Sequence, residues 1–299
     1  MVSFIDCHLS LRRCSPFNGG KFEGWGTSFC WWPNRIGYLD ELSEQAAKLF
    51  FDPKEGLGLN IIRYNIGGGD DPTHHHITRT DSMVPGYAIN PSHDANGYHW
   101  SYDWNADQNQ RNVLMKVAEC YGKDLIVEGF SNSPPYFMTN SGCSSGSVNA
   151  GENNLREDAY GAFASYLADV AQHFSKEWGI HFQSMTAMNE PDTEYWHALS
   201  DKQEGCHFDP GESQSVMIIA LREALDERGL NDILISGTDE TGIDCQINSI
   251  NSLSEVARET IARIDTHGYL EGANEGLRKL AQSYGKNLWL SEVEGGDPS

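Results

Sequence analysis

The stretch HFQSMTAMNEP, residues 181–191, decides the fold because it runs as an apolar strand and then stops on a carboxylate. Proline cannot donate to a sheet ladder, so Pro191 marks the end of the strand and places Glu190 at its mouth. A second apolar run, LWLSE at residues 288–292, stops on the carboxylate of Glu292. The sequence therefore predicts two acidic side chains at the ends of two separate strands.

The spacing of apolar residues along the chain, and the turn residues that bound each run, predict an alternation of strands and helices. The expected strands cover residues 22–32, 59–66, 124–131, 181–188, 233–236, 261–267 and 288–292. The expected helices cover residues 38–51, 105–122, 155–178, 212–229, 245–260 and 272–284. This order is typical of an α/β protein with a parallel sheet and helical crossovers.

Two architectures fit such an order, a (β/α)8 TIM barrel and a doubly wound open sheet. An open sheet that binds a nucleotide needs a glycine-rich turn between its first strand and a helix. The glycine triplet at residues 67–69 follows the second expected strand instead, and it leads into Asp70 and Asp71 rather than into a helix. We therefore expect the barrel.

The expected barrel is truncated after strand seven. A full barrel has eight strands, whereas the seventh expected strand ends at Glu292 in a chain of 299 residues. We expect an N-terminal segment of uncertain structure at residues 1–21 and a catalytic barrel at residues 22–299 that lacks the eighth unit. Two unpaired sheet edges predict poor solubility or oligomerisation, unless a missing C-terminal segment completes the barrel.

The charge of the chain restricts its partners. Asp and Glu number 43 against 21 Lys and Arg, which gives a net charge of -22. Such a surface repels nucleic acids and anionic membranes, and it favours a neutral oligo- or polysaccharide as substrate. The sequence also contains no run near the roughly 20 apolar residues of a membrane span.

The cysteines and the N-terminus bear on the compartment. Seven cysteines without a CxxC pair predict scattered thiols in a reducing environment, with a bridge between Cys143 and Cys206 as the alternative. Arg12 and Arg13 follow a short apolar stretch, which is the reverse of a secretory signal. We expect a cytoplasmic protein, or a secreted one whose signal has been removed.

The paired carboxylates predict chemistry on a glycosidic bond. Retaining hydrolysis needs one acid to protonate the leaving oxygen and one carboxylate about 5–5.5 Å away to attack the anomeric carbon. We assign Glu190 as the acid and Glu292 as the nucleophile. Glu294 shares the strand parity of Glu292, but the glycines at residues 295–296 indicate that the strand has already ended. Asn189 offers an amide to a sugar hydroxyl.

Three further polar residues lie within or at the ends of expected strands. Arg63 lies among Leu, Ile and Tyr, where a guanidinium without a carboxylate partner would be costly to bury. That partner is either the nucleophile or a structural acid. His267 and Tyr269 share one parity at the end of the sixth strand, so both could reach the cavity, although a satisfied core histidine is the alternative for His267.

Aromatic side chains are the expected walls of a sugar site. Trp31 and Trp32 follow the first strand, and Tyr195 and Trp196 follow the expected acid. Their flat apolar faces suit sugar rings, although aromatic residues also fill ordinary cores. The long irregular stretch at residues 67–104 carries more aromatics and is a candidate wall, with a self-packed surface loop as the alternative.

We expect no metal and no cofactor. His74, His75 and His76 are consecutive, and three consecutive side chains cannot easily converge on one ion. No HExxH or comparable spacing accompanies them.

Several motifs resemble glycoside hydrolase family 30 of the retaining-barrel clan, in particular its branch with β-1,6-galactanases. The motifs are FEGWGTS at 22–28, NIIRYNIGGG at 60–69, SNSPPYFMT at 131–139, NEP at 189–191 and YW at 195–196. The resemblance implies Glu190 as acid/base and Glu292 as nucleophile, braced by Arg63 and Tyr269. The substrate-binding residues that we expect are Arg63, Asn65, Asn189, Trp196, His267, Tyr269 and Trp32. The family's eighth strand and C-terminal β-sandwich have no counterpart in this sequence.

The sequence thus predicts a retaining β-galactan hydrolase, with β-1,6-galactanase activity favoured. The alternatives within the family are β-xylanase and β-glucosidase or glucosylceramidase activity, because only the walls of the pocket differ. A non-catalytic carbohydrate-binding remnant is the alternative outside the enzymes.

Overall fold

The computed structural model describes residues 22–270 and 272–294, and the expected N-terminal segment at 1–21 lies outside them. One sheet of seven parallel strands forms its centre, in the order β1-β2-β5-β6-β7-β8-β9. These strands are β1 (Gly26–Ser28), β2 (Ile61–Asn65), β5 (Ile126–Phe130), β6 (Ser184–Thr186), β7 (Leu234–Gly242), β8 (Ile261–Leu270) and β9 (Asn287–Glu292). The α/β fold and the seven-strand barrel are confirmed, because the sheet curls into a nearly closed barrel.

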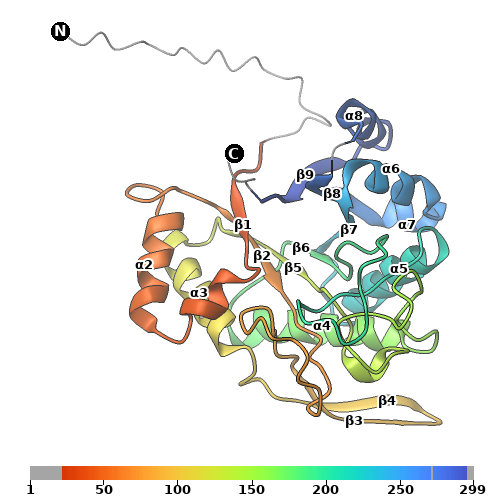
Figure 1. Ribbon diagram of the computed structural model, residues 1–299. Coiled ribbons are helices and arrows are strands. Elements are labelled where there is room, and N and C mark those ends of the chain that lie inside the picture. The colour runs from red at the N-terminus through yellow and green to blue at the C-terminus, as the bar shows by residue number, and fades with distance from the viewer. Residues whose placement is uncertain (1–21, 271, 295–299) are drawn as a thin grey trace.

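Helices follow the strands and cover the outside of the sheet (Figure 1). They are α1 (Trp32–Ile36), α2 (Asp40–Phe51), α3 (Gln108–Tyr121), α4 (Tyr160–Glu177), α5 (Glu212–Glu227), α6 (Ile243–Ser252), α7 (Glu255–Thr260) and α8 (Asn274–Ser283), with a 3-10 turn η2 (Tyr136–Met138). In the part of the chain that the structure describes, no helix is long and apolar enough to cross a bilayer.

Helix α4 shows why these segments are helical and where they pack. Phe163, Leu167, Val170 and Phe174 recur at the spacing of one helix face, and all four are buried. They join the apolar layer between the helices and the sheet. Along each strand, the side chains that face this layer alternate with side chains that face the opposite way. The second set fills the interior of the barrel.

The barrel interior is charged rather than apolar. Glu128 of β5 is completely buried and accepts hydrogen bonds from four side chains. The donors are Arg63 Nε at 3.2 Å, Arg263 Nη2, Ser184 Oγ at 2.7 Å and Ser236 Oγ at 2.8 Å. Because every one comes from a different strand, the buried charges hold the strands in register around the site.

Three expected elements differ in the structure. The expected strand at 22–32 is reduced to the three residues of β1, because Trp32 already begins α1. The expected helix at 245–260 is divided into α6 and α7. The stretch at 67–104 is not wholly irregular: β3 (Ala88–Asp94) and β4 (Gly97–Tyr102) form an antiparallel hairpin, which projects from one end of the barrel in Figure 1.

The barrel has an open seam between β1 and β9. The two strands approach each other, but among the described residues no hydrogen-bonded ladder joins them. A side-chain bond crosses the seam instead, from Trp289 Nε1 of β9 to Glu23 Oε2, 2.6 Å away. The seam lies where an eighth strand would pair in a full barrel.

Candidate active site

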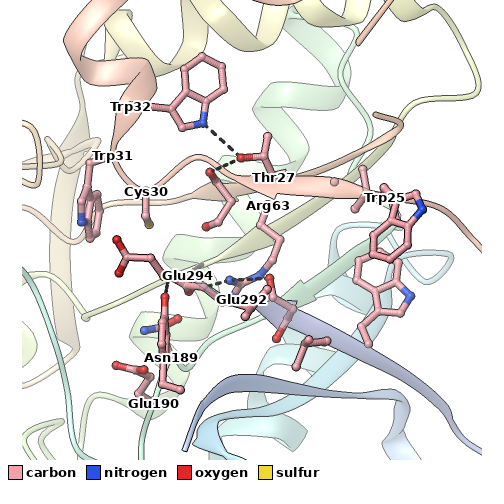
Figure 2. A pocket seen from close by; sticks show the side chains of 18 of the residues that line it. Trp25, Thr27, Cys30, Trp31, Trp32, Arg63, Asn189, Glu190, Glu292 and Glu294 are labelled. Atoms are coloured by element: carbon pink, nitrogen blue, oxygen red, sulfur yellow. Dashed lines mark hydrogen bonds and ion pairs between the residues drawn. The ribbon is translucent and has the colours of Figure 1, made fainter. Parts of the chain in front are cut away.

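A cavity of about 930 Å³ opens at the carboxyl ends of the strands and continues along the seam. Its lining includes both predicted carboxylates, Glu190 after β6 and Glu292 at the end of β9. Trp31 and Trp25 lie on opposite sides of these carboxylates in Figure 2. This is the face on which barrel enzymes carry their catalytic groups.

The main chain turns sharply at Glu190. Its φ of 49° lies in the left-handed region, and the following Pro191 ends the strand. Two hydrogen bonds hold the main chain there: the Glu190 N–H donates to Asp239 O at 2.8 Å, and Trp196 Nε1 donates to Glu190 O at 3.0 Å. The turn directs the carboxylate to His267 Nδ1 at 3.0 Å and to the Tyr195 hydroxyl at 2.7 Å.

Glu292 is the last residue of β9, and both of its oxygens have donors. Arg63 Nη1 lies 3.0 Å from Oε2, and the Tyr269 hydroxyl lies 3.1 Å from Oε1. Figure 2 shows the guanidinium of Arg63 reaching Glu292 across the cavity. Glu294 lies beyond the strand and is exposed. The contacts therefore favour Glu292 over Glu294 as the oriented carboxylate.

His267 connects the two carboxylates. Its Nδ1 faces Glu190, while its Nε2 lies 3.5 Å from Glu292 Oε2 and 3.3 Å from Asp239 Oδ1. The ring is fully buried and does not line the cavity, so it is placed to position the acids. Our prediction that His267 binds substrate stays untested, and its placement agrees with the alternative of a buried histidine with satisfied partners.

The charges around His267 fix its protonation. Burial alone would lower the pKa of His267, but the negative charge of Asp239 and the hydrogen bonds that the ring donates to Asp239 and Glu190 raise it to about 10. Burial likewise would raise the pKa of Glu190, but the hydrogen bond and charge of His267 hold it below its usual value. Around neutral pH the pair therefore holds one proton, centred on the imidazole.

Asp239 supplies the charge that keeps this proton. It is fully buried in β7, and burial alone would raise its pKa, yet Arg63 and His267 bring the pKa well below its usual range. It contacts Arg63 Nη2, and it accepts a hydrogen bond from Ser291 Oγ at 2.6 Å. Arg63 thus contacts three carboxylates, those of Glu128, Asp239 and Glu292.

Two residues that we predicted to bind substrate do not line the cavity. Trp196 is buried against Gly205 and does not line the cavity, because its indole turns inward to bond the main chain of Glu190. The neighbouring Tyr195 is the aromatic residue that reaches the acid. Asn65 is also enclosed and absent from the lining, and its main chain is bonded at both N and O to the side chain of Gln110.

The other predicted contacts line the cavity. Asn189 is buried beside the acid, and its Oδ1 has no hydrogen-bond partner among the described residues. Trp32 lies on the wall, with its Nε1 bonded to Thr27 Oγ1 at 3.3 Å. Tyr269 is partly exposed at the mouth. These three side chains are open to a sugar, whereas Trp196 and Asn65 are not.

Sequence reasoning missed the charged residues behind the site. Arg263 and Asp265 form a buried pair, with Nε and Oδ1 2.6 Å apart, and Arg263 also contacts Glu128. The signal was present, because Arg263 and Asp265 share the parity of His267 along β8 and therefore point into the barrel as it does. Asp239 was harder to predict, because the expected strand ended at Ser236, whereas β7 continues past Asp239 to Gly242.

The profile of O-glycosyl hydrolase family 30 matches residues 21–252. The chain belongs to this family. It is 37% identical to an endo-β-1,6-galactanase of Hypocrea rufa over 94% of its own length and 60% of that protein. It is 27% identical to an exo-β-1,6-galactobiohydrolase of Bifidobacterium longum over 94% of its length and 24% of that larger protein. The family 30 chain thus spans less than two thirds of each of these curated relatives, 60% of the first and 24% of the second.

Solved structures agree on the fold of the family 30 chain. A conserved exported protein from Bacteroides fragilis superposes with a TM-score of 0.72 at 22% identity, over 92% of this chain and 61% of that one. The catalytic domain of a family 30 xylanase C from Talaromyces cellulolyticus gives a TM-score of 0.64 at 21% identity, over 82% and 53% of the two chains.

Proposed function

We propose that the chain carries the catalytic centre of a retaining glycosidase that hydrolyses β-1,6-linked galactan. The observation that carries this proposal is the pair of strand-end carboxylates on either side of one protonated imidazole. Glu190 and Glu292 contact opposite nitrogens of His267, so the ring sets their separation. A sugar-binding protein without catalysis has no need of such a pair.

The first step forms a glycosyl-enzyme. Glu292 Oε attacks the anomeric carbon, and the bond from that carbon to the leaving oxygen breaks. The leaving oxygen takes a proton from Glu190 as Glu190 receives one from Nδ1 of His267, 3.0 Å away, so Glu190 ends the step as a carboxylate and His267 as a neutral ring. Donors from Arg63 and Tyr269 stabilise the charge on Glu292 and orient its oxygens before the attack.

The second step releases the sugar. Glu190, now a carboxylate, removes a proton from water, and the water oxygen attacks the anomeric carbon as the bond to Glu292 breaks. The two inversions restore the β configuration. The proton that Glu190 removes from water then passes to His267, whose pKa of about 10 restores the protonated imidazole at neutral pH.

The likeness to the Hypocrea rufa enzyme supports galactan as the substrate. The net charge of -22 and the aromatic side chains of Trp25, Trp31 and Trp32 around the cavity are compatible with a neutral sugar chain. The xylanase of Talaromyces cellulolyticus shares the fold at 21% identity, so it does not favour xylan.

The test is a covalent label followed by a product profile. Incubation with an activated 2-fluoro-galactoside should increase the mass of the chain by one fluorogalactosyl group, and peptide mapping should place the group on Glu292. Glu292→Gln should take up no label, and Glu294→Gln is the matched control that should. A wild-type chain that takes up none would indicate a binding protein.

Substrate class is tested separately on β-1,6-galactan, β-1,4-galactan and xylan, with the released sugars analysed by chromatography. Oligosaccharides from β-1,6-galactan alone support the proposal. Release of more sugar from xylan than from either galactan would indicate a xylanase, with the proposed mechanism unchanged.

A further inference from the structure

We propose that Asp70, His74, His76 and Cys143 form a structural Zn²⁺ site that ties together loops of the catalytic face. One ligand atom from each residue lies within 4.8 Å of every other. The cluster is outside the active-site cavity and takes no part in the mechanism above. The sequence argument considered three consecutive histidines and missed that alternate ones can converge.

The distances already approach those of a tetrahedral site. His76 Nε2 lies 2.6 Å from Asp70 Oδ2 and 3.3 Å from Cys143 Sγ, and His74 Nδ1 lies 3.3 Å from Asp70 Oδ1. Zinc with Zn–N near 2.0 Å and Zn–S near 2.3 Å separates its ligand atoms by roughly 3.3–3.6 Å. Only small rotations of the carboxylate and of the His74 ring are therefore needed.

The hydrogen bond of His76 to the main chain turns its Nε2 toward the other members of the cluster. Its Nδ1 lies 2.5 Å from the carbonyl oxygen of Ser200, which can only accept, so Nδ1 carries a proton. In the neutral ring Nε2 is then an acceptor, yet it faces a carboxylate oxygen of Asp70, which is an acceptor too. These two lone-pair atoms converge on one point, as two ligands of a metal ion do.

The sulfur of Cys143 is a third donor at the same point. Cys143 Sγ lies beside the same Nε2 and is buried. The sulfur also accepts the main-chain N–H of Leu199 at 3.4 Å and lies 3.2 Å from Ser145 Oγ. The Leu199 N–H thus helps to hold the sulfur beside the imidazole, at a distance from which a thiolate can join a zinc site.

The chemistry of the donors selects the ion. Thiolate and imidazole favour Zn²⁺ over Ca²⁺ and Mg²⁺, and four protein ligands without an open position are typical of a structural site. The bond from His76 to the Ser200 carbonyl has the form of the outer hydrogen bond that orients metal-bound histidines. Asp70 has such a bond too, from the Ser144 N–H at 3.0 Å.

The ion would join three segments that follow different strands. Asp70, His74 and His76 follow β2, Cys143 follows β5, and the orienting carbonyl of Ser200 follows β6. The last segment also contains Tyr195, whose hydroxyl donates to Glu190 Oε2 at 2.7 Å. The site would therefore stabilise the loop that carries a donor to the acid, while leaving the carboxylates themselves untouched.

The test loads chelator-treated protein with Co²⁺ or Zn²⁺. We expect one ion per chain by elemental analysis, a thiolate-to-cobalt charge-transfer band, and a melting temperature that falls with chelator and recovers with zinc.

His76→Ala and His74→Ala should each lower the affinity for zinc at least tenfold, and Cys143→Ser should abolish the charge-transfer band. His75→Ala is the matched control, since His75 is exposed and outside the cluster. Cys120→Ser is the control for loss of a thiol.

Three outcomes would overturn the proposal: less than a tenth of an ion per chain, a cobalt spectrum without the thiolate band, or equal affinities in His75→Ala and His76→Ala. Circular dichroism of each variant identifies loss of fold. If Cys143→Ser does not fold, the wild-type cobalt spectrum and His74→Ala decide the question. The fluoro-sugar label on Glu292 is measured on the same samples, so a failed metal site and a failed glycosidase assignment are distinguishable.

Discussion

Arg63 Nη1 lies 3.0 Å from Glu292 Oε2, although the two residues are 229 positions apart in the chain. The same guanidinium contacts Glu128 and Asp239 and stacks over the ring of Phe130, 4.1 Å from its centroid. One buried side chain thus connects the second strand of the barrel to the carboxylate on the last.

Removing Arg63 should damage both stability and catalysis. Arg63→Met leaves three carboxylates near one another without their shared cation, and breaking a buried pair costs about 3–5 kcal/mol. We expect a clear fall in melting temperature and loss of activity. Arg63→Lys keeps the charge but loses the fork of donors, so kcat should fall more than the melting temperature. Arg35→Met, which removes an exposed arginine from Asp81 but leaves Asp81 paired with Arg79, is the control and should change little. Equal melting temperatures for Arg63→Met and Arg35→Met would contradict this role of Arg63.

Alanine variants of the two carboxylates should give glycosyl azides of opposite anomeric configuration. Glu190→Ala should lower kcat on a poor leaving group by about 10²–10⁴-fold, because general acid catalysis is worth that much. Azide should then capture the glycosyl-enzyme and give the β-azide. In Glu292→Ala, azide should replace the missing nucleophile and give the α-azide. Nuclear magnetic resonance of the products reports the configuration, and the same anomer from both variants would contradict the assignment.

His267 should make stability depend on pH on the alkaline side. Its pKa rises from 6.5 in the unfolded chain to about 10 in the folded protein, so the folded state binds the proton more tightly. This contribution is fully present below pH 6.5 and is lost as pH rises to about 10. Wild type should therefore lose unfolding free energy across this interval, and His267→Asn should show a flatter profile. Parallel profiles from denaturant titrations would show that His267 is neutral in the folded state.

Tyr195→Phe removes a hydroxyl that donates to Glu190 Oε2 at 2.7 Å. Loss of the donor destabilises the carboxylate and raises the pKa of the Glu190–His267 pair. The alkaline limb of kcat/KM should therefore move to higher pH. Tyr284→Phe, at the surface and bonded to Arg258, is the control and should leave the limb in place. A shift to lower pH would contradict the donor role.

The bond across the seam should be measurable as a coupling energy. Trp289→Phe keeps a ring beneath Arg263 but loses the indole donor, and Glu23→Gln removes the charge that accepts it. A hydrogen bond to a charged group contributes about 1.5–3 kcal/mol. The double variant should therefore be less destabilised than the two single variants summed. Strict additivity in denaturant melts would show that the bond does not hold β9 to β1.

The sequence predicted strand ends better than it predicted side-chain directions. Glu190 and Glu292 could be placed because apolar runs stop abruptly beside them. Trp196 could not be distinguished from Tyr195, since the turn that buries one and exposes the other depends on contacts with distant residues. The position of Asp239 could not be predicted either, because its burial depends on an ion pair with Arg63 from another strand.

The seam gives the proposed nucleophile an unusual support. Among the described residues β9 has one hydrogen-bonded neighbour, β8, so Glu292 sits on an edge strand and is steadied mainly by side chains. Edge strands open locally at lower free energy than central ones. Amide hydrogen exchange should therefore be faster in β9 than in β5 or β6, and catalysis should disappear in dilute denaturant while most of the barrel remains intact.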